Sequence, residues 1–271
     1  MLGFAWLAGS CSAAAADFQY PLAVVATNDA MFVADRNLPG VWSVVDGTPA
    51  IFFQGSKKFR TPLNAVRCLA VDREGRLIAG DSSTRQIYRF ENGAPVPLLT
   101  TKTGIGIPMG IAVDRQGDLV VTDLETQRLC RIPANGEAPT WFANVAAPRG
   151  IAVDDEDRLW VVSHGSNQLV RVTAEGKSEV IVSGRPFQFP HCVAFDDQKT
   201  AYVSDGYAKT IWKIDASGKP TAWAAGEPLK NPVGIWWQEK RLLIADPQAR
   251  ALFAADREGR ITRLTPEVAA P

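Results

Sequence analysis

The chain has 271 residues, of which 46% are hydrophobic and 21% charged, and Lys plus Arg equals Asp plus Glu at 29 each. This composition is ordinary for a soluble globular protein, and the length is sufficient for one large all-β domain. The balanced charge excludes the global basic footprint that a nucleic-acid-binding protein carries.

The N-terminus differs in kind from the rest of the chain. Residues 2–9, LGFAWLAG, are apolar, and small residues follow as far as Ala16. This pattern is typical of a secretory signal peptide, and the apolar run is too short to span a bilayer as a helix. We therefore predict a signal peptide at 1–16 and a secreted or periplasmic mature chain, 17–271. A lipid anchor through Cys11 is the alternative localisation, because the residues before it resemble a lipoprotein box.

The remaining chain repeats one pattern six times. Each copy has an apolar run, a tight polar turn, a second apolar run and a polar end residue, as in PMGIAVDRQGDLVVTD at 108–123. The end residues are Asp35, Asp81, Asp123, His164, Asp205 and Asp246. Successive numbers in this series differ by 46, 42, 41, 41 and 41. A period of about 40–45 residues is typical of a propeller built from four-stranded blades.

Each repeat predicts four strands in chain order. In the third copy they fall near 111–113, 119–121, 129–132 and 140–144. The first two runs are continuously apolar, which indicates strands buried on both faces. A single blade cannot bury both of its faces, so the blades must stack around a ring. We predict an all-β, six-bladed β-propeller with four antiparallel strands per blade, its blades at about 20–55, 64–101, 106–145, 147–184, 189–226 and 231–266.

The repeated sequence also carries a family resemblance. Pro-x-Gly-Ile-Ala-Val-Asp, followed after a short gap by a hydrophobic residue, Val, a small residue and Asp, resembles the NHL-repeat family over nearly all of 20–266. The copy at 190–205 is also similar, more distantly, to the regucalcin and gluconolactonase propellers. The first resemblance implies a binding or interaction module, and the second implies a calcium-dependent lactonase.

One end of the predicted channel gathers positive charge. In a propeller, the starts of the innermost strands crowd around one mouth of the central channel. The residues there are Leu22, Arg67, Met109, Arg149, His191 and Val233. Converging guanidinium groups suit a carboxylate or a phosphate. The predicted ligand-binding residues are Arg67, Arg149, His191, His164, Met109 and Arg185.

A basic mouth on a neutral chain points to an anionic partner. We expect an anionic small molecule, an acidic glycan or a protein partner, bound by a monomer with no nucleic acid and no transmembrane segment. Phe187 and Phe189 are expected to form an apolar wall beside the cations. The alternative is that the mouth cations pair with the neighbouring Asp residues and only keep the protein soluble.

The polar residue at the end of each second strand has a structural explanation. A short carboxylate there accepts hydrogen bonds from the backbone N–H groups of the adjacent turn. Repetition at nearly every blade favours this role over a catalytic one. His164 breaks the series, and it is either a structural substitute or part of the site.

The lactonase resemblance leaves an enzyme open: a lactonase-like hydrolase or a metal-dependent lyase with its site at the channel mouth. In that family an acidic residue and Asn residues hold the cation, whereas the corresponding places here hold Leu22, Arg149 and His191. Hard cations need several oxygen ligands, which an Arg opposes. We therefore expect no catalytic residue and no cofactor. For Ca²⁺ or Zn²⁺ the remaining candidate ligands are His164, His191 and Asp205.

The binding module and the metal-dependent enzyme differ in their response to metal ions. A resident cation stabilises the folded state that binds it. Added Ca²⁺ or Zn²⁺ is therefore expected to leave the melting temperature of the binding module unchanged. Thermal unfolding with each ion, and with Mg²⁺ as the control, measures this. A rise of several degrees specific to Ca²⁺ or Zn²⁺ would contradict the module and support the enzyme.

Overall fold

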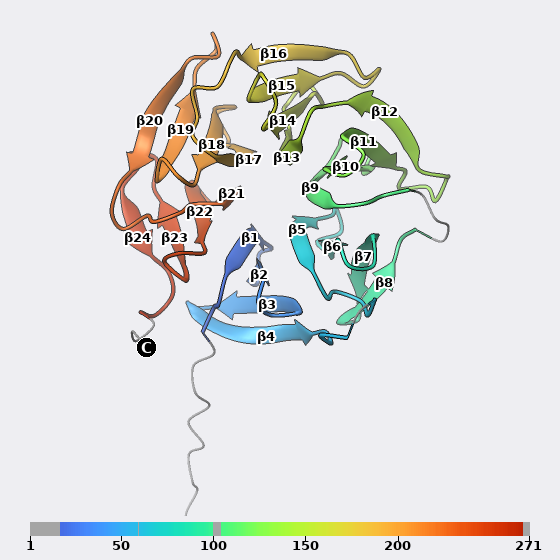
Figure 1. Ribbon diagram of the computed structural model, residues 1–271. Helices are drawn as coiled ribbons and strands as arrows, with labels where there is room; N and C mark the ends of the chain where they lie inside the picture. Colours follow the sequence, from blue (N-terminus) through green and yellow to red (C-terminus); the bar gives the residue numbers. More distant parts are fainter. Residues whose placement is uncertain (1–16, 59, 100–103, 268–271) are drawn as a thin grey trace, which may run out of the picture.

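The computed structural model describes residues 17–58, 60–99 and 104–267, so the predicted signal peptide and Cys11 lie outside the described residues. Within these ranges the strands form six four-stranded antiparallel sheets, each made of four strands consecutive in sequence. The sheets are arranged radially around one centre (Figure 1). The prediction of an all-β, six-bladed propeller is therefore confirmed. No helix long and apolar enough to cross a membrane occurs among the described residues.

The two inner strands of each blade come from the two apolar runs of the repeat. The innermost strands are β1 (Pro21–Ala26), β5 (Val66–Val71), β9 (Pro108–Val113), β13 (Pro148–Val153), β17 (Pro190–Phe195) and β21 (Gly234–Gln238). The second strands are β2 (Met31–Asp35), β6 (Leu77–Asp81), β10 (Leu119–Asp123), β14 (Leu159–Ser163), β18 (Ala201–Asp205) and β22 (Arg241–Asp246).

The two outer strands complete each blade toward solvent. The third strands are β3 (Gly40–Val45), β7 (Gln86–Glu91), β11 (Arg128–Ile132), β15 (Leu169–Val172), β19 (Thr210–Ile214) and β23 (Ala251–Ala255). The outermost strands are β4 (Thr48–Gln54), β8 (Ala94–Pro97), β12 (Thr140–Asn144), β16 (Ser178–Val182), β20 (Pro220–Ala225) and β24 (Ile261–Arg263).

The hydrophobic core lies between the blades. Each of the six interfaces holds one cluster of buried side chains, drawn from the two blades that meet there. In the cluster between the second and third blades, for example, Ile78 and Val121 are fully buried. Burying such an aliphatic side chain contributes about 1.5–3 kcal/mol. The two-sided burial predicted from the continuous apolar runs is what holds the ring together.

The ring closes by packing, without exchange of a strand between blades. β21 lies beside β1, and the sixth blade is built entirely from the C-terminal repeat. The segment before β1 covers this junction, because Phe18 packs edge-on against Trp42 in the cluster shared by the sixth and first blades. Arg250 Nε donates a hydrogen bond to the Phe18 carbonyl at 2.9 Å. The two ends of the described chain therefore meet at one seam.

In the blades other than the fourth, the Asp that ends the second strand fastens the segment that leads into the innermost strand. The Asp123 carboxylate accepts hydrogen bonds from the backbone N–H groups of Gly106 (2.7 Å), Ile107 (3.0 Å) and Glu125 (2.9 Å). Corresponding bonds are made by Asp35, Asp81, Asp205 and Asp246. The structural role predicted for these carboxylates is confirmed.

The fourth blade corrects the sequence alignment by one residue. Ser163 pairs with Pro148 at the place where Asp123 pairs with Pro108. Its hydroxyl donates to the Ala146 carbonyl at 2.7 Å, so Ser163 and not His164 replaces the carboxylate. The interpretation of His164 as the break in the Asp series is therefore wrong. His164 follows the strand, and its imidazole contacts Arg149 and the Pro190 carbonyl.

Asp123→Ala is expected to destabilise the protein by about 3 kcal/mol, because three backbone N–H groups lose their acceptor and each unsatisfied buried group costs about 1–3 kcal/mol. Ser163→Ala, at the matched position, removes a single hydroxyl and is expected to cost about 1 kcal/mol. Urea unfolding measures both changes. Equal losses for the two variants would contradict the fastening role of the carboxylate.

Candidate functional site

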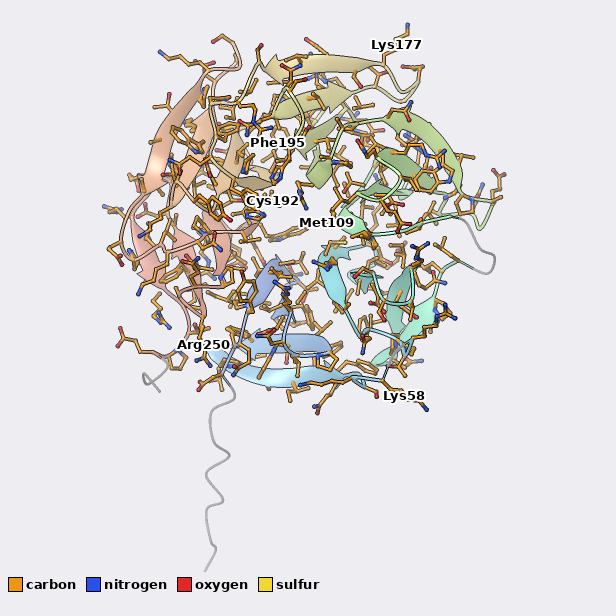
Figure 2. The ribbon with its side chains drawn as sticks, in the orientation of Figure 1. Lys58, Met109, Lys177, Cys192, Phe195 and Arg250 are labelled. Atoms are coloured by element: carbon orange, nitrogen blue, oxygen red, sulfur yellow. The ribbon has the colours of Figure 1, made fainter. Side chains whose placement is uncertain are left out.

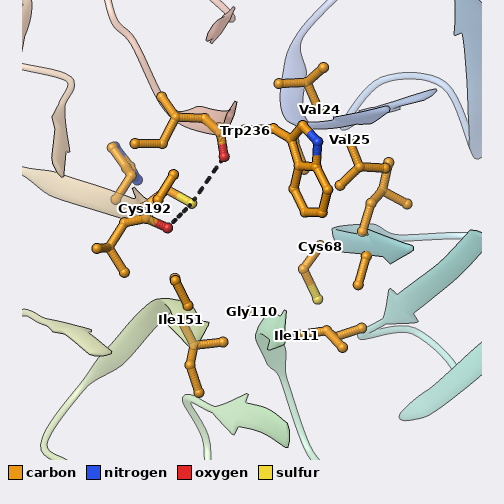
Figure 3. Close-up of a pocket in the computed structure, with 18 of the residues that line it drawn as sticks. Val24, Val25, Cys68, Gly110, Ile111, Ile151, Cys192 and Trp236 are labelled. Atoms are coloured by element: carbon orange, nitrogen blue, oxygen red, sulfur yellow. Dashed lines mark hydrogen bonds between the residues drawn. The ribbon is translucent and has the colours of Figure 1, made fainter. Parts of the chain in front are cut away.

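A central channel of about 640 Å³ runs along the innermost strands. The strands line it over most of their length, as Arg67 to Val71 of β5 show. Figure 2 places Met109 and Cys192 at the central opening, and Figure 3 shows side chains from several blades around its wall. The channel is thus the place where residues distant in sequence meet.

Positive charge gathers at the mouth of the channel where the innermost strands begin. Arg67, Met109, Arg149 and His191 all line it, so the structure brings these four predicted residues together. Arg36, which the sequence analysis did not select, lines the same mouth. No Asp or Glu occurs among the described residues that line the channel. We call Arg36, Arg67 and Arg149 the arginine cluster.

The arginine cluster carries charge that no described acid neutralises. Arg67 Nε donates to the Ser82 hydroxyl at 3.2 Å, and the Arg36 guanidinium lies 5.6 Å from the ring centre of Tyr20. Burial lowers the pKa of Arg67 and the neighbouring Arg36 lowers it further. Burial, and then Arg67, likewise lower the pKa of Arg149. The guanidinium groups repel one another, so an anion between them is favoured.

His164 positions Arg149 and does not line the channel itself. Its Nδ1 accepts from the Arg149 guanidinium, at 3.3 Å from Nε and 3.2 Å from Nη2. Since an Arg can only donate, the His164 proton sits on Nε2, which donates to the Pro190 carbonyl at 2.6 Å. Burial lowers the pKa of His164, and Arg149 adds to this effect. The imidazole is therefore neutral near pH 7.

His191 stands on the channel wall as a second neutral imidazole. Burial, followed by His164 and Arg149, lowers the pKa of His191 to about 3. A Cβ at Gly206 would lie 3.2 Å from His191 Nε2 and 2.1 Å from Asn231 Oδ1, so a larger residue there would displace the Asn231 amide. Asn231 is 5% exposed, and its Oδ1 has no hydrogen-bond partner among the described residues. A buried acceptor without a described partner thus lies near His191.

Aromatic rings flank this side of the mouth. Phe189 lines the channel, with its ring centre 4.5 Å from that of His164 and 4.9 Å from that of His191. Tyr207 stacks on Phe189 at 4.6 Å and is 64% exposed. Phe187 is only 3% exposed and packs into the core between two blades. The expected apolar wall is therefore supplied by Phe189 alone, and its assignment to Phe187 is wrong.

Arg185 fastens a loop outside the channel wall. Its Nη1 donates to the carbonyls of His164 (2.7 Å) and Gly165 (3.0 Å), and it does not line the channel. These bonds hold the turn after β14, and with it the His164 imidazole beside Arg149. The structure thus brings Arg185 to the backbone of His164 but not to the channel wall.

The described residues do not fit a resident Ca²⁺ or Zn²⁺. No group of three His, Cys, Asp or Glu side chains close enough to share an ion occurs among them. The Asp205 carboxylate already accepts from the Gln188 and Phe189 N–H groups at 2.8 and 2.7 Å. His164 and His191 are surrounded by guanidinium charge, which repels a cation. The donor set suits an anion instead.

Arg36 was missed because the alignment placed His164 one residue too early. Arg36 follows Asp35 in the first blade as His164 follows Ser163 in the fourth, and the backbone N–H of each donates to an equivalent carbonyl, that of Tyr20 or Ala147. Aligning the strand ends on Ser163 would have placed both side chains in one ring. The sequence does not indicate that Tyr207 belongs to the mouth, because the exposure of its side chain depends on the conformation of the turn after β18.

The sequence model of the SMP-30/Gluconolactonase/LRE-like region matches residues 21–204. A comparison with curated proteins gives no match. The NHL resemblance therefore describes the repeat only approximately, and the distant similarity to the gluconolactonase propellers is confirmed.

Solved structures share the fold at low sequence identity. A gluconolactonase from Xanthomonas campestris superposes with a TM-score of 0.75 at 16% identity, covering 91% of this chain and 87% of that one. Virginiamycin B lyase from Staphylococcus aureus superposes with a TM-score of 0.70 at 17% identity, covering 92% of this chain and 85% of the lyase. A chain of a nidogen–laminin complex superposes with a TM-score of 0.70 at 17% identity, covering 91% of this chain and 93% of that one. Likeness at this level establishes architecture and not activity.

The lowered pKa of His191 has a consequence for stability. Between about pH 3 and pH 6.5 an unfolded chain binds a proton that the folded His191 does not, so stability rises with pH across this interval and is level above it. Wild type is therefore expected to lose more stability than His191→Asn between pH 7 and pH 5, as measured by urea unfolding. NMR titration of the two histidines provides the control. A titration midpoint between pH 6 and 7 for His191 would contradict its burial as a neutral imidazole.

Proposed function

The chain belongs to the SMP-30/gluconolactonase/LRE-like family, and we propose that it binds a small anionic molecule at the mouth of its central channel. The observation that carries the proposal is the arginine cluster, three guanidinium groups that face one cavity with no carboxylate among its described lining residues. A carboxylate or a phosphate is the group that such donors recognise.

Burial strengthens this site. Arg67 and Arg149 are half-buried, so their charges are screened less by water than those of exposed side chains. Burial is the main cause of the lowered pKa of Arg67 and of Arg149, and repulsion from a neighbouring guanidinium adds to it. A bound anion offsets that repulsion and accepts charge-assisted hydrogen bonds. The cavity of about 640 Å³ lies within the range of 300–1,000 Å³ typical of small-molecule sites.

A small molecule fits this arrangement better than an extended acidic glycan or protein segment. Arg67 and Arg149 stand on the second residue of innermost strands, where the surrounding blades limit approach from the side. Arg149 is held in place by His164, and Met109 and Phe189 offer apolar contacts around the anion. A macromolecular partner would have to insert a narrow acidic tip into the mouth.

A lactonase-like hydrolase or a lyase is the second candidate, and His191 is the observation that favours it. A neutral imidazole accepts a proton, and the neighbouring Arg149 would stabilise a developing oxyanion. In the virginiamycin B lyase of Staphylococcus aureus, a histidine-to-alanine variant is catalytically inactive. A pKa near 3 makes His191 a weak base, which is why anion binding is the first proposal.

Arg67→Ala and Arg149→Ala are each expected to weaken the binding of inorganic phosphate about 10- to 100-fold, because a hydrogen bond to a charged group contributes about 1.5–3 kcal/mol. Isothermal titration calorimetry of phosphate measures the change. Arg73→Ala is the matched control, since Arg73 is exposed in the turn at the other end of the same blade. Unchanged binding in the Arg67→Ala, Arg149→Ala double variant would remove the proposed site.

A panel of lactones and esters separates the two candidates. Turnover that requires His191 and Arg149 together, and survives Arg73→Ala, would make the protein an enzyme. Anion binding without turnover across the panel supports the binding module.

A further inference from the structure

Beneath the arginine cluster the channel wall is apolar. Every charged residue among the described lining residues belongs to the mouth, and the strand residues below it are uncharged. The side chains that surround the opening in Figure 3 include Val24, Cys68, Ile111, Ile151, Cys192 and Trp236. A basic entrance and an apolar interior thus share one cavity.

The two thiols in this wall behave as apolar groups. Burial raises the pKa of Cys68 far above its ordinary value and raises that of Cys192 as well, so both remain neutral. The Cys192 sulfur lies 3.8 Å from the Ile235 carbonyl and 3.7 Å from the Val193 carbonyl (Figure 3). Its weak donor is therefore already used within the wall, and the thiol presents its sulfur as a soft apolar surface.

Trp236 adds an aromatic ring to the apolar wall. It packs against the cluster between the sixth and first blades and also against the cluster between the first and second blades. A side chain from β21 reaches both clusters only by lying along β1 at the channel, beside Val24 (Figure 3). Its indole is half-buried, so part of the ring stays open to the cavity.

The dimensions of the channel favour a slender occupant. A six-residue strand is about 20 Å long. A volume of about 640 Å³ distributed over that length makes the cavity longer than it is wide. The cavity therefore has room for a single chain or a narrow ring system along its axis, with its polar end at the mouth.

We propose that the ligand is an amphipathic carboxylate, whose head contacts Arg67 and Arg149 and whose slender apolar body lies in the channel against Cys192 and Trp236, two wall residues that are only half-buried. This inference rests on the proposed anion site and names the ligand class that the same cavity selects. The charge at one end and the apolar wall below it orient the molecule head outward.

The test is a titration with three straight-chain carboxylates, acetate, hexanoate and decanoate, each below its critical micelle concentration. Inorganic phosphate is the reference, because it carries no apolar chain. Each methylene buried in the channel is expected to lower Kd about fourfold. Tryptophan fluorescence gives a second readout, because decanoate contacts the Trp236 indole. The emission change with decanoate is expected to be lost in Trp236→Phe and kept in Trp160→Phe.

Two variants distinguish the contribution of the ligand's carboxylate from that of its apolar chain. Arg67→Ala is expected to weaken all three carboxylates by a similar factor. Cys192→Phe fills the channel from its wall and is expected to abolish the gain from acetate to decanoate, while phosphate binds as before. Cys192→Leu is a milder form of the same change, for use if the larger ring prevents folding.

The outcomes distinguish this inference from the proposed function. Phosphate binding that depends on Arg67, with the same Kd for acetate and decanoate, overturns the amphipathic ligand and leaves the anion site. Failure of phosphate and all carboxylates to bind overturns both. Decanoate binding that is unaffected by Arg67→Ala and by Cys192→Phe places the apolar body elsewhere and also overturns the inference.

Discussion

Burial of both faces of every blade is the constraint on which the rest of the structure depends. Each core cluster draws its side chains from two neighbouring blades, so no blade has a complete core of its own. The only arrangement of six such units without an exposed apolar face is a closed ring. Closure brings β21 against β1, and Phe18 seals the junction from the N-terminal side. The central channel is a consequence of that closure.

The same closure explains why the mouth is basic although the chain is neutral. Equivalent positions of the innermost strands meet at one end, so Arg67 and Arg149 share a cavity despite their separation in sequence. The acids that might neutralise them are engaged elsewhere. Asp123 and its counterparts bind backbone N–H groups, and acids of the hairpin turns such as Asp154 pair with Arg158 in the same turn. Positive charge therefore stands above an apolar wall, with no described carboxylate paired to it.

Much of this could be predicted from the sequence, because the repeat assigns the same place to corresponding residues. The repeat period predicts the number and bounds of the blades. The second position of the innermost strands predicts that Arg67, Met109, Arg149 and His191 meet at one mouth. What failed depended on local geometry that the repeat does not encode. His164 was aligned one residue too early since Ser163 replaces the usual carboxylate by a hydroxyl. The same misalignment left out Arg36, which occupies the equivalent place in the first blade. Phe187 was expected at the wall, but the conformation of its loop buries it, and Tyr207 was not selected because the turn after β18 orients it.

Anomalous X-ray diffraction from crystals grown with selenate, an anion that replaces sulfate or phosphate, tests the central claim most directly. The account predicts a selenium peak at the channel mouth, within hydrogen-bonding distance of the Arg67 and Arg149 guanidinium groups. A mouth without such a peak, in which those guanidinium groups are ion-paired with a carboxylate of the chain, would contradict it.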